Sequence, residues 1–386
     1  MDSLFVCPRC GNDDPRYVGF ISNRPYCRRC IVFKGQEAEA DVFPSSSDAE
    51  LKLDYELSQE QKALSEELVA HYRNGEHVLV HAVTGAGKTE IVYAVMAAAI
   101  DSGHEVGLAI PRRDVVIELA GRLRGAFPRL TITAVYGGHH DELQGDIVIL
   151  TTHQIYRYVA YFDLLVIDEC DAFPFKDDPV LEAFARRSLK GVLVAMSATP
   201  TPALIERFRA PGHHILRLWT RYHRHPLPVP KTIVSSLLFN FDCLLGFIIR
   251  YRKEGKPLLI FVPTIAIGER LFFYVKIFAK KGALVHSLRP DRTEIIDSFR
   301  AGRYDYLIST SVLERGITVL NLQVVVFAAD HPLFDEGTLL QMSGRVGRKA
   351  EAPEGEVTFL SRRRTPAMLA AIKTINHANA HLQVVL

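Results

Sequence analysis

From Leu57 onward, short apolar runs alternate with amphipathic segments along the chain. The first series of runs comprises 77–82, 105–111, 131–136, 146–152, 164–169 and 191–199. Continuous apolar runs of this length are typical of strands that are buried on both faces of a sheet. Because helical segments separate the runs, the pattern predicts a parallel sheet covered by helices, which is an α/β domain.

The stretch 211–231, PGHHILRLWTRYHRHPLPVPK, interrupts this rhythm with several prolines and a cluster of His and Arg. We interpret it as a linker between two domains. A second series of apolar runs follows at 258–264, 283–287, 306–311, 323–329 and 356–361, again with helical segments between them. The prediction is therefore an N-terminal module at 1–50 and two α/β domains at 51–215 and 216–386. The aromatic run 272–274 lies inside an apolar helical stripe and is expected in the core.

Overall charge changes this picture little. The formal net charge is +2, which by itself indicates no nucleic-acid partner. No apolar run approaches the roughly 18 residues that span a bilayer, and the first ten residues do not form a signal peptide. We expect a cytoplasmic protein.

Four of the six cysteines are concentrated in the first thirty residues. Cys7, Cys10, Cys27 and Cys30 form the spacing C-x2-C-x16-C-x2-C, which is typical of a tetrahedral zinc site with four thiolate ligands. A zinc ion there would supply folding energy to a segment too small to fold alone. A redox dithiol is the alternative. The basic and aromatic residues of this module suit either nucleic-acid contact or docking to a protein.

Residues 82–89 read AVTGAGKT and stand between an apolar run and a helical pattern. A glycine-rich loop between a strand and a helix is typical of a phosphate-binding loop, although Ala82 replaces its usual first glycine. Lys88 would meet the terminal phosphates of ATP or GTP, and the Thr89 hydroxyl would ligate Mg²⁺. The residues expected to surround the phosphates are Thr84, Gly85, Ala86, Gly87, Lys88 and Thr89.

A second half of such a site follows in LLVIDECDAFPF, where an apolar run ends at Asp168 and Glu169. Carboxylates at the C-terminal end of a parallel strand face the ligand crevice of an α/β sheet. Asp168 is placed to hold Mg²⁺, and Glu169 to orient or deprotonate the attacking water. Asp171 is expected to link this site to later motifs.

With these motifs in order, residues 55–362 resemble helicase superfamily two, whose members have two RecA-like domains. The resemblance implies that Gln61 in LSQEQ reads adenine, so that the nucleotide is ATP, and that SAT at 197–199 couples hydrolysis to nucleic-acid binding. LERGITV at 313–319 is similar to a late motif that places Gly316 at the nucleotide. QMSGRVGRK at 341–349 is similar to the motif that supplies arginines to the γ-phosphate. Arg345 and Arg348 are the candidates, Arg348 first, and they would act when the cleft between the domains closes.

Polar groups after several predicted strands would hold the phosphates of a nucleic-acid strand without reading its sequence. Tyr136 or Tyr156 could stack on bases. The expected contact residues are Arg112, Arg113, Gly137, Thr151 and Thr152 in the first domain, and Thr264, Ser309 and Thr310 in the second.

The cysteine module, VTGAGKTE and DECDAFPF together resemble the late competence ATPases of Gram-positive bacteria. That resemblance implies a motor that uses ATP, Mg²⁺ and Zn²⁺ to move along single-stranded DNA during DNA uptake. It also implies work with other competence proteins and the membrane DNA channel, at the inner face of the cell membrane. A general DNA or RNA helicase, or a nucleotide-switched zinc adaptor without motor activity, remains an alternative. Oligomeric state is left open.

Overall fold

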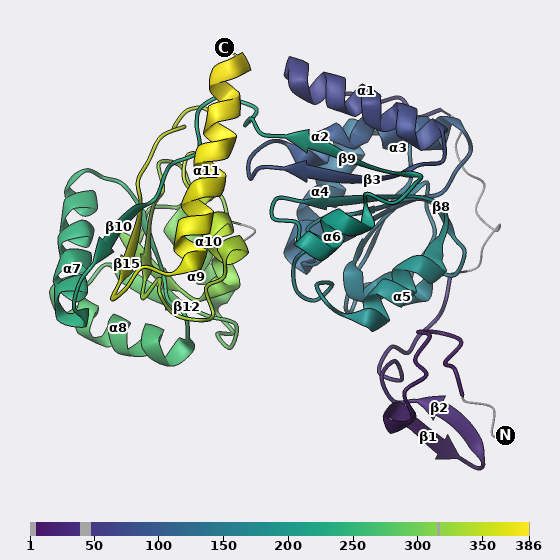
Figure 1. Cartoon of the computed structure of the whole chain (residues 1–386), viewed down its shortest axis with the longest axis horizontal. Coiled ribbons are helices and arrows are strands. Elements are labelled where there is room, and N and C mark those ends of the chain that lie inside the picture. Colours follow the sequence, from purple (N-terminus) through teal and green to yellow (C-terminus); the bar gives the residue numbers. More distant parts are fainter. Residues whose placement is uncertain (1–4, 39–47, 315–316, 386) are drawn as a thin grey trace. The chain divides into compact units, whose positions relative to one another are not determined.

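The computed structural model describes residues 5–38, 48–314 and 317–385, which form two compact units (Figure 1). Unit 1 comprises Met1–Ala82 and Gly87–Leu218, and unit 2 comprises Val83–Ala86 and Trp219–Leu386. Each unit contains a parallel sheet with helices, as the alternating apolar runs predict.

The sheet of unit 1 has the strand order β5-β6-β4-β7-β8-β3-β9, and every neighbouring pair is parallel. Every apolar run of the first series forms one of its strands. The strands are β3 (His77–Ala82), β4 (Val106–Ile110), β5 (Ile132–Val135), β6 (Ile147–Thr151), β7 (Phe162–Ile167), β8 (Leu189–Ser197) and β9 (His213–Leu218). The helices are α1 (Gln59–Arg73), α2 (Lys88–Ile91), α3 (Tyr93–Asp101), α4 (Arg113–Ala126), α5 (Pro179–Ser188) and α6 (Pro202–Arg207), with a 3-10 helix η2 (Thr152–Arg157).

The sheet of unit 2 has the order β10-β15-β14-β11-β13-β12 and is also parallel throughout. Its strands are β10 (Lys231–Val234), β11 (Leu258–Phe261), β12 (Gly282–Val285), β13 (Tyr306–Ser309), β14 (Gln323–Phe327) and β15 (Val357–Ser361). The helices are α7 (Leu237–Lys253), α8 (Ile265–Phe278), α9 (Arg292–Arg300), α10 (Glu336–Ser343) and α11 (Pro366–Val385), with a 3-10 helix η3 (Ser311–Leu313). The five strands from β11 to β15 are buried along their whole length, which explains their unbroken apolar runs.

The predicted linker at 211–231 is partly wrong. Its first third forms β9, which pairs with β3 at the edge of the first sheet, and the expected domain boundary at 215/216 lies inside this strand. Only Leu216 and Leu218 of β9 are buried, so few of its positions are apolar core positions. Its polar composition therefore obscured it in the sequence.

The expectation that 272–274 lies in the core is also wrong for two of the three residues. Leu271 and Val275 of α8 are buried against the sheet, whereas Phe273 is 68% and Tyr274 54% exposed. The apolar side chains of α8 extend over a wider part of the helix surface than the part that packs on the sheet. An apolar face of α8 consequently points to solvent, with Ile277 and Phe278 also exposed.

The N-terminal module contains a 3-10 helix η1 (Pro15–Tyr17) and an antiparallel hairpin of β1 (Val18–Ile21) and β2 (Arg24–Cys27). Its two-residue turn has Ser22 and Asn23 at positive φ, as the right-handed twist of short hairpins favours. After the module, Phe33 packs edge-on against Phe184 of α5, at 5.1 Å between ring centroids. The module is thus continuous with the apolar core of unit 1.

Among the described residues, no helix is both long enough and apolar enough to span a bilayer.

Candidate functional site

The phosphate-binding loop connects β3 to α2, as the strand, loop and helix pattern predicts. Gly85 and Gly87 have φ values of +83° and +76°, a backbone conformation that residues with a Cβ rarely adopt. The ammonium group of Lys88 donates a hydrogen bond of 3.4 Å to the Ala82 carbonyl at the end of β3. The loop therefore presents its backbone amides at the N-terminus of a helix, an arrangement that suits a polyphosphate.

Gln61 lies beside this loop although it is far away in the sequence. Its side-chain oxygen accepts a 2.9 Å hydrogen bond from the Ser58 amide, and the Ser58 hydroxyl accepts one of 3.2 Å from the Gln61 amide. This reciprocal capping box begins α1 and fixes the rotamer of Gln61. A Cβ built on Gly87 would collide with the amide nitrogen of the Gln61 side chain. Gln61 can take this position because residue 87 has no side chain.

Asp168 and Glu169 follow directly after β7, at the edge of the sheet where the parallel strands end. The Glu169 amide donates a 2.9 Å hydrogen bond to the Asp168 carboxylate. Glu169 has φ +52°, a left-handed conformation that costs a non-glycine residue about 1 kcal/mol or more. Both side chains are partly exposed, so both can reach a ligand in the crevice.

Asp171 connects the acidic motif to SAT, as predicted. Its carboxylate accepts a hydrogen bond from the Thr199 hydroxyl, and the Thr199 amide donates one of 2.9 Å to the Ser197 hydroxyl. Two loops at neighbouring strand ends are thereby held together.

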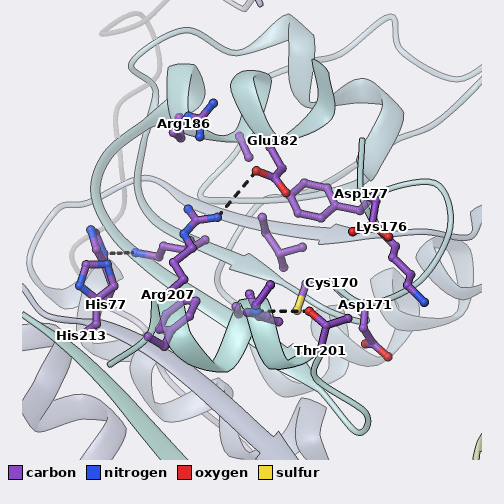
Figure 2. A pocket seen from close by; sticks show the side chains of 18 of the residues that line it. His77, Cys170, Asp171, Lys176, Asp177, Glu182, Arg186, Thr201, Arg207 and His213 are labelled. Atoms are coloured by element: carbon purple, nitrogen blue, oxygen red, sulfur yellow. Dashed lines mark hydrogen bonds and ion pairs between the residues drawn. The ribbon is translucent and has the colours of Figure 1, made fainter. Parts of the chain in front are cut away.

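A cavity of about 360 Å³ lies next to the acidic motif (Figure 2). Cys170 and Asp171 form one part of its wall, and Thr201 and Arg207 of the segment after SAT form another. Lys88, Asp168 and Glu169 do not line it. The cavity is therefore separate from the predicted nucleotide site.

In unit 2 the two candidate arginines differ in environment. Arg345 is 1% exposed and donates hydrogen bonds to the carbonyl oxygens of Ile317, at 3.1 Å, and Gln341, at 3.4 Å. Arg348 is partly exposed and donates a 3.2 Å hydrogen bond to the Gly344 carbonyl. Arg345 is thus built into the unit, whereas Arg348 can contact a ligand. Gly316 lies outside the described residues.

Arg221 is a buried cation that the sequence did not single out. It is 2% exposed, and its guanidinium donates a 2.7 Å hydrogen bond to the Gly347 carbonyl, next to Arg348. His223 Nε2 lies 3.0 Å from the same carbonyl. Burial, together with the nearby charge of Arg348, lowers the pKa of Arg221 to about 9. Because this pKa is still above neutral pH, Arg221 stays protonated. The sequence signal was its place in the cluster of His and Arg at 211–231, two residues after the single Trp.

The predicted nucleic-acid contacts of unit 1 fall into exposed and buried groups. Arg113 lies over the Tyr136 ring, with 4.8 Å between the guanidinium carbon and the centroid, and Gly137 follows in an exposed turn. Arg112 donates to Asp114, at 2.8 Å. In contrast, Thr151 is 7% and Thr152 0% exposed, so their side chains cannot meet a strand in this conformation.

Tyr156 is not available to stack on bases. It is 4% exposed, its hydroxyl donates a 2.6 Å hydrogen bond to the Lys34 carbonyl, and its ring lies 5.6 Å from that of Phe33. The residue therefore joins η2 to the segment after the cysteine module.

In unit 2 the predicted contacts gather where β11 and β13 end, because these neighbouring strands are parallel. The Thr264 hydroxyl caps α8 by accepting from the Ile267 amide at 3.2 Å, and the Ser309 hydroxyl donates to the Thr310 carbonyl at 2.8 Å. Ser309 is fully buried, whereas Thr264 and Thr310 are partly exposed. Thr264 and Thr310 are the better candidates on this edge.

The four cysteines converge, and all are buried. The Sγ atoms of Cys7 and Cys30 are 3.6 Å apart, as are those of Cys10 and Cys27. Zinc–sulfur bonds of about 2.3 Å in a tetrahedron place sulfur atoms roughly 3.8 Å apart, so the four thiols fit a zinc ion. Burial raises the pKa of Cys10 to about 11 and also raises that of Cys30. A bound cation would reverse this by stabilising the thiolates.

Comparison with known proteins gives the family. The DEAD/DEAH box helicase family matches residues 60–208, and the helicase conserved C-terminal domain matches residues 240–350. Competence protein ComFA of Bacillus subtilis is 35% identical over 399 residues, covering 97% of this chain and 86% of that protein. Competence protein ComFA of Streptococcus pneumoniae is 36% identical over 370 residues, covering 92% and 85%.

Solved structures agree on the fold. S. cerevisiae Dbp5 bound to RNA and ADP BeF3 has a TM-score of 0.60 at 18% identity, and the match covers 84% of this chain and 92% of that one. These findings confirm the predicted pair of RecA-like domains and both resemblances drawn from the sequence. The chain therefore belongs to the ComFA family and is a nucleic-acid-dependent ATPase of the DEAD/DEAH helicase type.

Proposed function

We propose that this protein is an ATP-driven motor that moves along single-stranded DNA and powers the uptake of transforming DNA. The observation that carries the proposal is the match to two ComFA proteins over 97% and 92% of the chain. The helicase families match residues 60–208 and 240–350, so the two ComFA matches extend beyond these segments. A general helicase would share the core alone.

The phosphate-binding loop and residues of unit 1 supply one half of the proposed reaction. The amides of Thr84 to Gly87, with Lys88, would bind the phosphates of ATP. Thr89 and Asp168 would hold Mg²⁺, which neutralises charge on the phosphates when it is bound. Glu169 would orient the attacking water, and Gln61 would select adenine.

Unit 2 supplies the other half. Arg348 is partly exposed, and a small movement of its side chain would break its hydrogen bond to the Gly344 carbonyl. We therefore assign Arg348 the role of stabilising charge on the γ-phosphate. Arg345, with its buried bonds to Ile317 and Gln341, holds the loop in position. Because Lys88 and Arg348 belong to different units, hydrolysis would depend on how the units meet, and this dependence is what couples ATP to movement.

The strand would be held by its phosphates. Arg112, Arg113 and Gly137 in unit 1, with Thr264 and Thr310 in unit 2, are exposed or partly exposed and would contact phosphate oxygens. We place the motor in the cytoplasm, at the inner face of the cell membrane, through other competence proteins and the DNA channel. The cysteine module, with its surrounding arginines, would contact DNA or dock to one of these partners.

The test is the ATPase rate of the purified chain with single-stranded DNA, duplex DNA or RNA, all at one fixed low salt concentration. Salt must be constant because phosphate-dominated binding depends steeply on it. A many-fold stimulation by single-stranded DNA alone is the expected result. Lys88→Ala should abolish both basal and stimulated turnover, which shows that the measured activity belongs to this site.

Equal stimulation by RNA would contradict the DNA-uptake assignment and favour a general helicase. If no nucleic acid stimulates an active ATPase, the motor proposal fails and a nucleotide-switched zinc adaptor takes its place. A DNA-stimulated chain should next be tested on a single strand with a labelled obstacle at either end, because displacement from one end only demonstrates directional translocation.

A further inference from the structure

Two groups of metal-binding side chains converge within the part of the chain that the structure describes. One is the four-cysteine cluster. The other consists of His71 near the end of α1, Glu76 in the following loop and His214 on β9, all partly buried. We propose that these three residues form a second zinc site on the edge of unit 1.

The donor atoms are close to the positions that a zinc ion requires. His71 Nδ1 lies 2.7 Å from Glu76 Oε2, and His214 Nε2 lies 3.3 Å from Glu76 Oε1. In a tetrahedral site with bonds of about 2.0 to 2.1 Å, donor atoms are roughly 3.3 Å apart. All three donors lie within 4.8 Å of one another, so small side-chain rotations bring the longest separation into range.

The two imidazole rings already face the same carboxylate. The rings of His71 and His214 are stacked, 4.0 Å between centroids and 24° between planes. Two imidazoles and one carboxylate suit Zn²⁺ and leave a fourth position for water.

A further carboxylate occupies the outer shell. Glu67 Oε1 lies 3.8 Å from Nε2 of His71, the nitrogen that does not face Glu76. When a zinc-bound histidine coordinates through one nitrogen, the other usually donates to a carboxylate, which fixes the tautomer. His71 would therefore bind through Nδ1 and donate from Nε2 to Glu67. An ordinary histidine–glutamate ion pair does not require this second carboxylate.

The proposed site joins α1, the helix that carries Gln61, to the strand β9. α1 carries Gln61 in its first turn and His71 in its last, and β9 is the last strand of unit 1. A metal bridge between His71 and His214 would fasten α1 to the edge of the sheet. This second site has nitrogen and oxygen donors, so it is chemically distinct from the cysteine cluster.

β9 also provides a matched control. Successive side chains of a strand point to opposite faces, so His213 lies on the face away from His214. There its ring meets that of His77 at 4.9 Å, beside the cavity (Figure 2). Removal of His213 thus changes the same strand and the same residue type without touching the proposed donors.

The experiment is the zinc content of the full-length chain, loaded with Zn²⁺ alone and freed of excess by dialysis. We expect the parent chain and His213→Ala to retain one zinc ion more per chain than His71→Ala and His214→Ala. Loading with Co²⁺ distinguishes the two sites, because only thiolate ligands give intense sulfur-to-metal charge-transfer absorption. The ion lost in the His71 and His214 variants should lack that absorption.

A second variant guards against misfolding. Glu76→Gln keeps an oxygen that can accept from histidine but removes the charge, and it should weaken zinc binding at least about 10-fold, as should Glu67→Gln. The melting temperature without added metal reports whether each variant folds. If the parent, His71→Ala and Glu76→Gln bind the same number of zinc ions with the same affinity, the proposal is wrong. The two histidines then only form ion pairs with Glu76.

Discussion

Glu169 combines a strained backbone with a position at the crevice edge of β7. The left-handed conformation of Glu169 costs about 1 kcal/mol or more, and the surrounding structure holds it there. We predict that Glu169→Gln lowers the kcat for ATP by about 10²-fold or more, because the amide cannot accept a proton from the attacking water. ATPase assays and nucleotide-binding titrations should show lost turnover with retained ATP binding. Residual turnover close to that of the parent would remove Glu169 from the mechanism.

Arg345 and Arg348 are three residues apart but should respond differently to substitution. Arg345→Ala leaves the carbonyls of Ile317 and Gln341 without their buried donor, so we expect unit 2 to lose about 2 to 4 kcal/mol of stability. Arg348→Ala removes a partly exposed group and should leave stability nearly unchanged, while lowering kcat by about 10³-fold. Thermal melts and ATPase assays on both variants check this. Equal melting temperatures would contradict the structural role of Arg345.

His81 on β3 should make the stability of unit 1 depend on pH. Burial, together with the charges of Arg217 and Lys88, lowers its pKa from 6.5 to about 4. Between these two values the unfolded chain binds a proton that the folded chain does not, so stability falls as the pH decreases from about 6.5 to 4. In His81→Gln this contribution is absent, and the difference in melting temperature between pH 7 and pH 5 should shrink. An unchanged pH dependence would show that His81 does not carry it.

α8 illustrates how one helix can present apolar residues on two faces. Leu271 and Val275 pack on the sheet, whereas Phe273 and Ile277 are exposed. We predict that Leu271→Ala costs about 2 to 5 kcal/mol in the free energy of unfolding, because it leaves a cavity in the core. Phe273→Ser should cost less than about 0.5 kcal/mol, since it changes only surface. Urea unfolding of the two variants separates these outcomes, and a large loss in Phe273→Ser would mean that the exposed face is covered.

Elements also differ in how well their own residues predict them. The inner strands are buried on both faces, so each one appears in the sequence as a continuous apolar run. β9 has a mixed composition, and only Leu216 and Leu218 are buried in it. Its existence depends on β3, which lies more than a hundred residues earlier in the chain.

The cysteine module joins the molecule through a small apolar contact. Phe33 lies against Phe184, and Tyr156 donates to the Lys34 carbonyl. We predict that Cys27→Ser lowers the zinc content by one ion and unfolds the β1–β2 hairpin, because a segment of this size lacks its own core. Hydrogen exchange should become fast in residues 18–27 and stay slow in β11, whose core belongs to unit 2. A hairpin that stays protected would show that zinc is not what holds it.

The sequence by itself determined the class of this protein and predicted the residues of its main sites. Lys88, Asp168 and the cysteines are defined by short spacings next to apolar runs, and such patterns depend on local geometry that any compact fold must respect. The position of Gln61 could be inferred through resemblance to helicases. All of these features rest on residues that are near one another in the chain or at the ends of recognisable strands.

Only the tertiary structure decided which of the remaining candidates face solvent and which distant residues meet. Thr152 and Tyr156 lie in a polar-looking segment yet are buried, and Tyr156 contacts the chain after the cysteine module. Arg221 meets Gly347, and His71 meets His214, across more than a hundred residues. Burial and long-range contact are properties of how elements pack on one another, and the periodicity of a single segment contains no record of its neighbours.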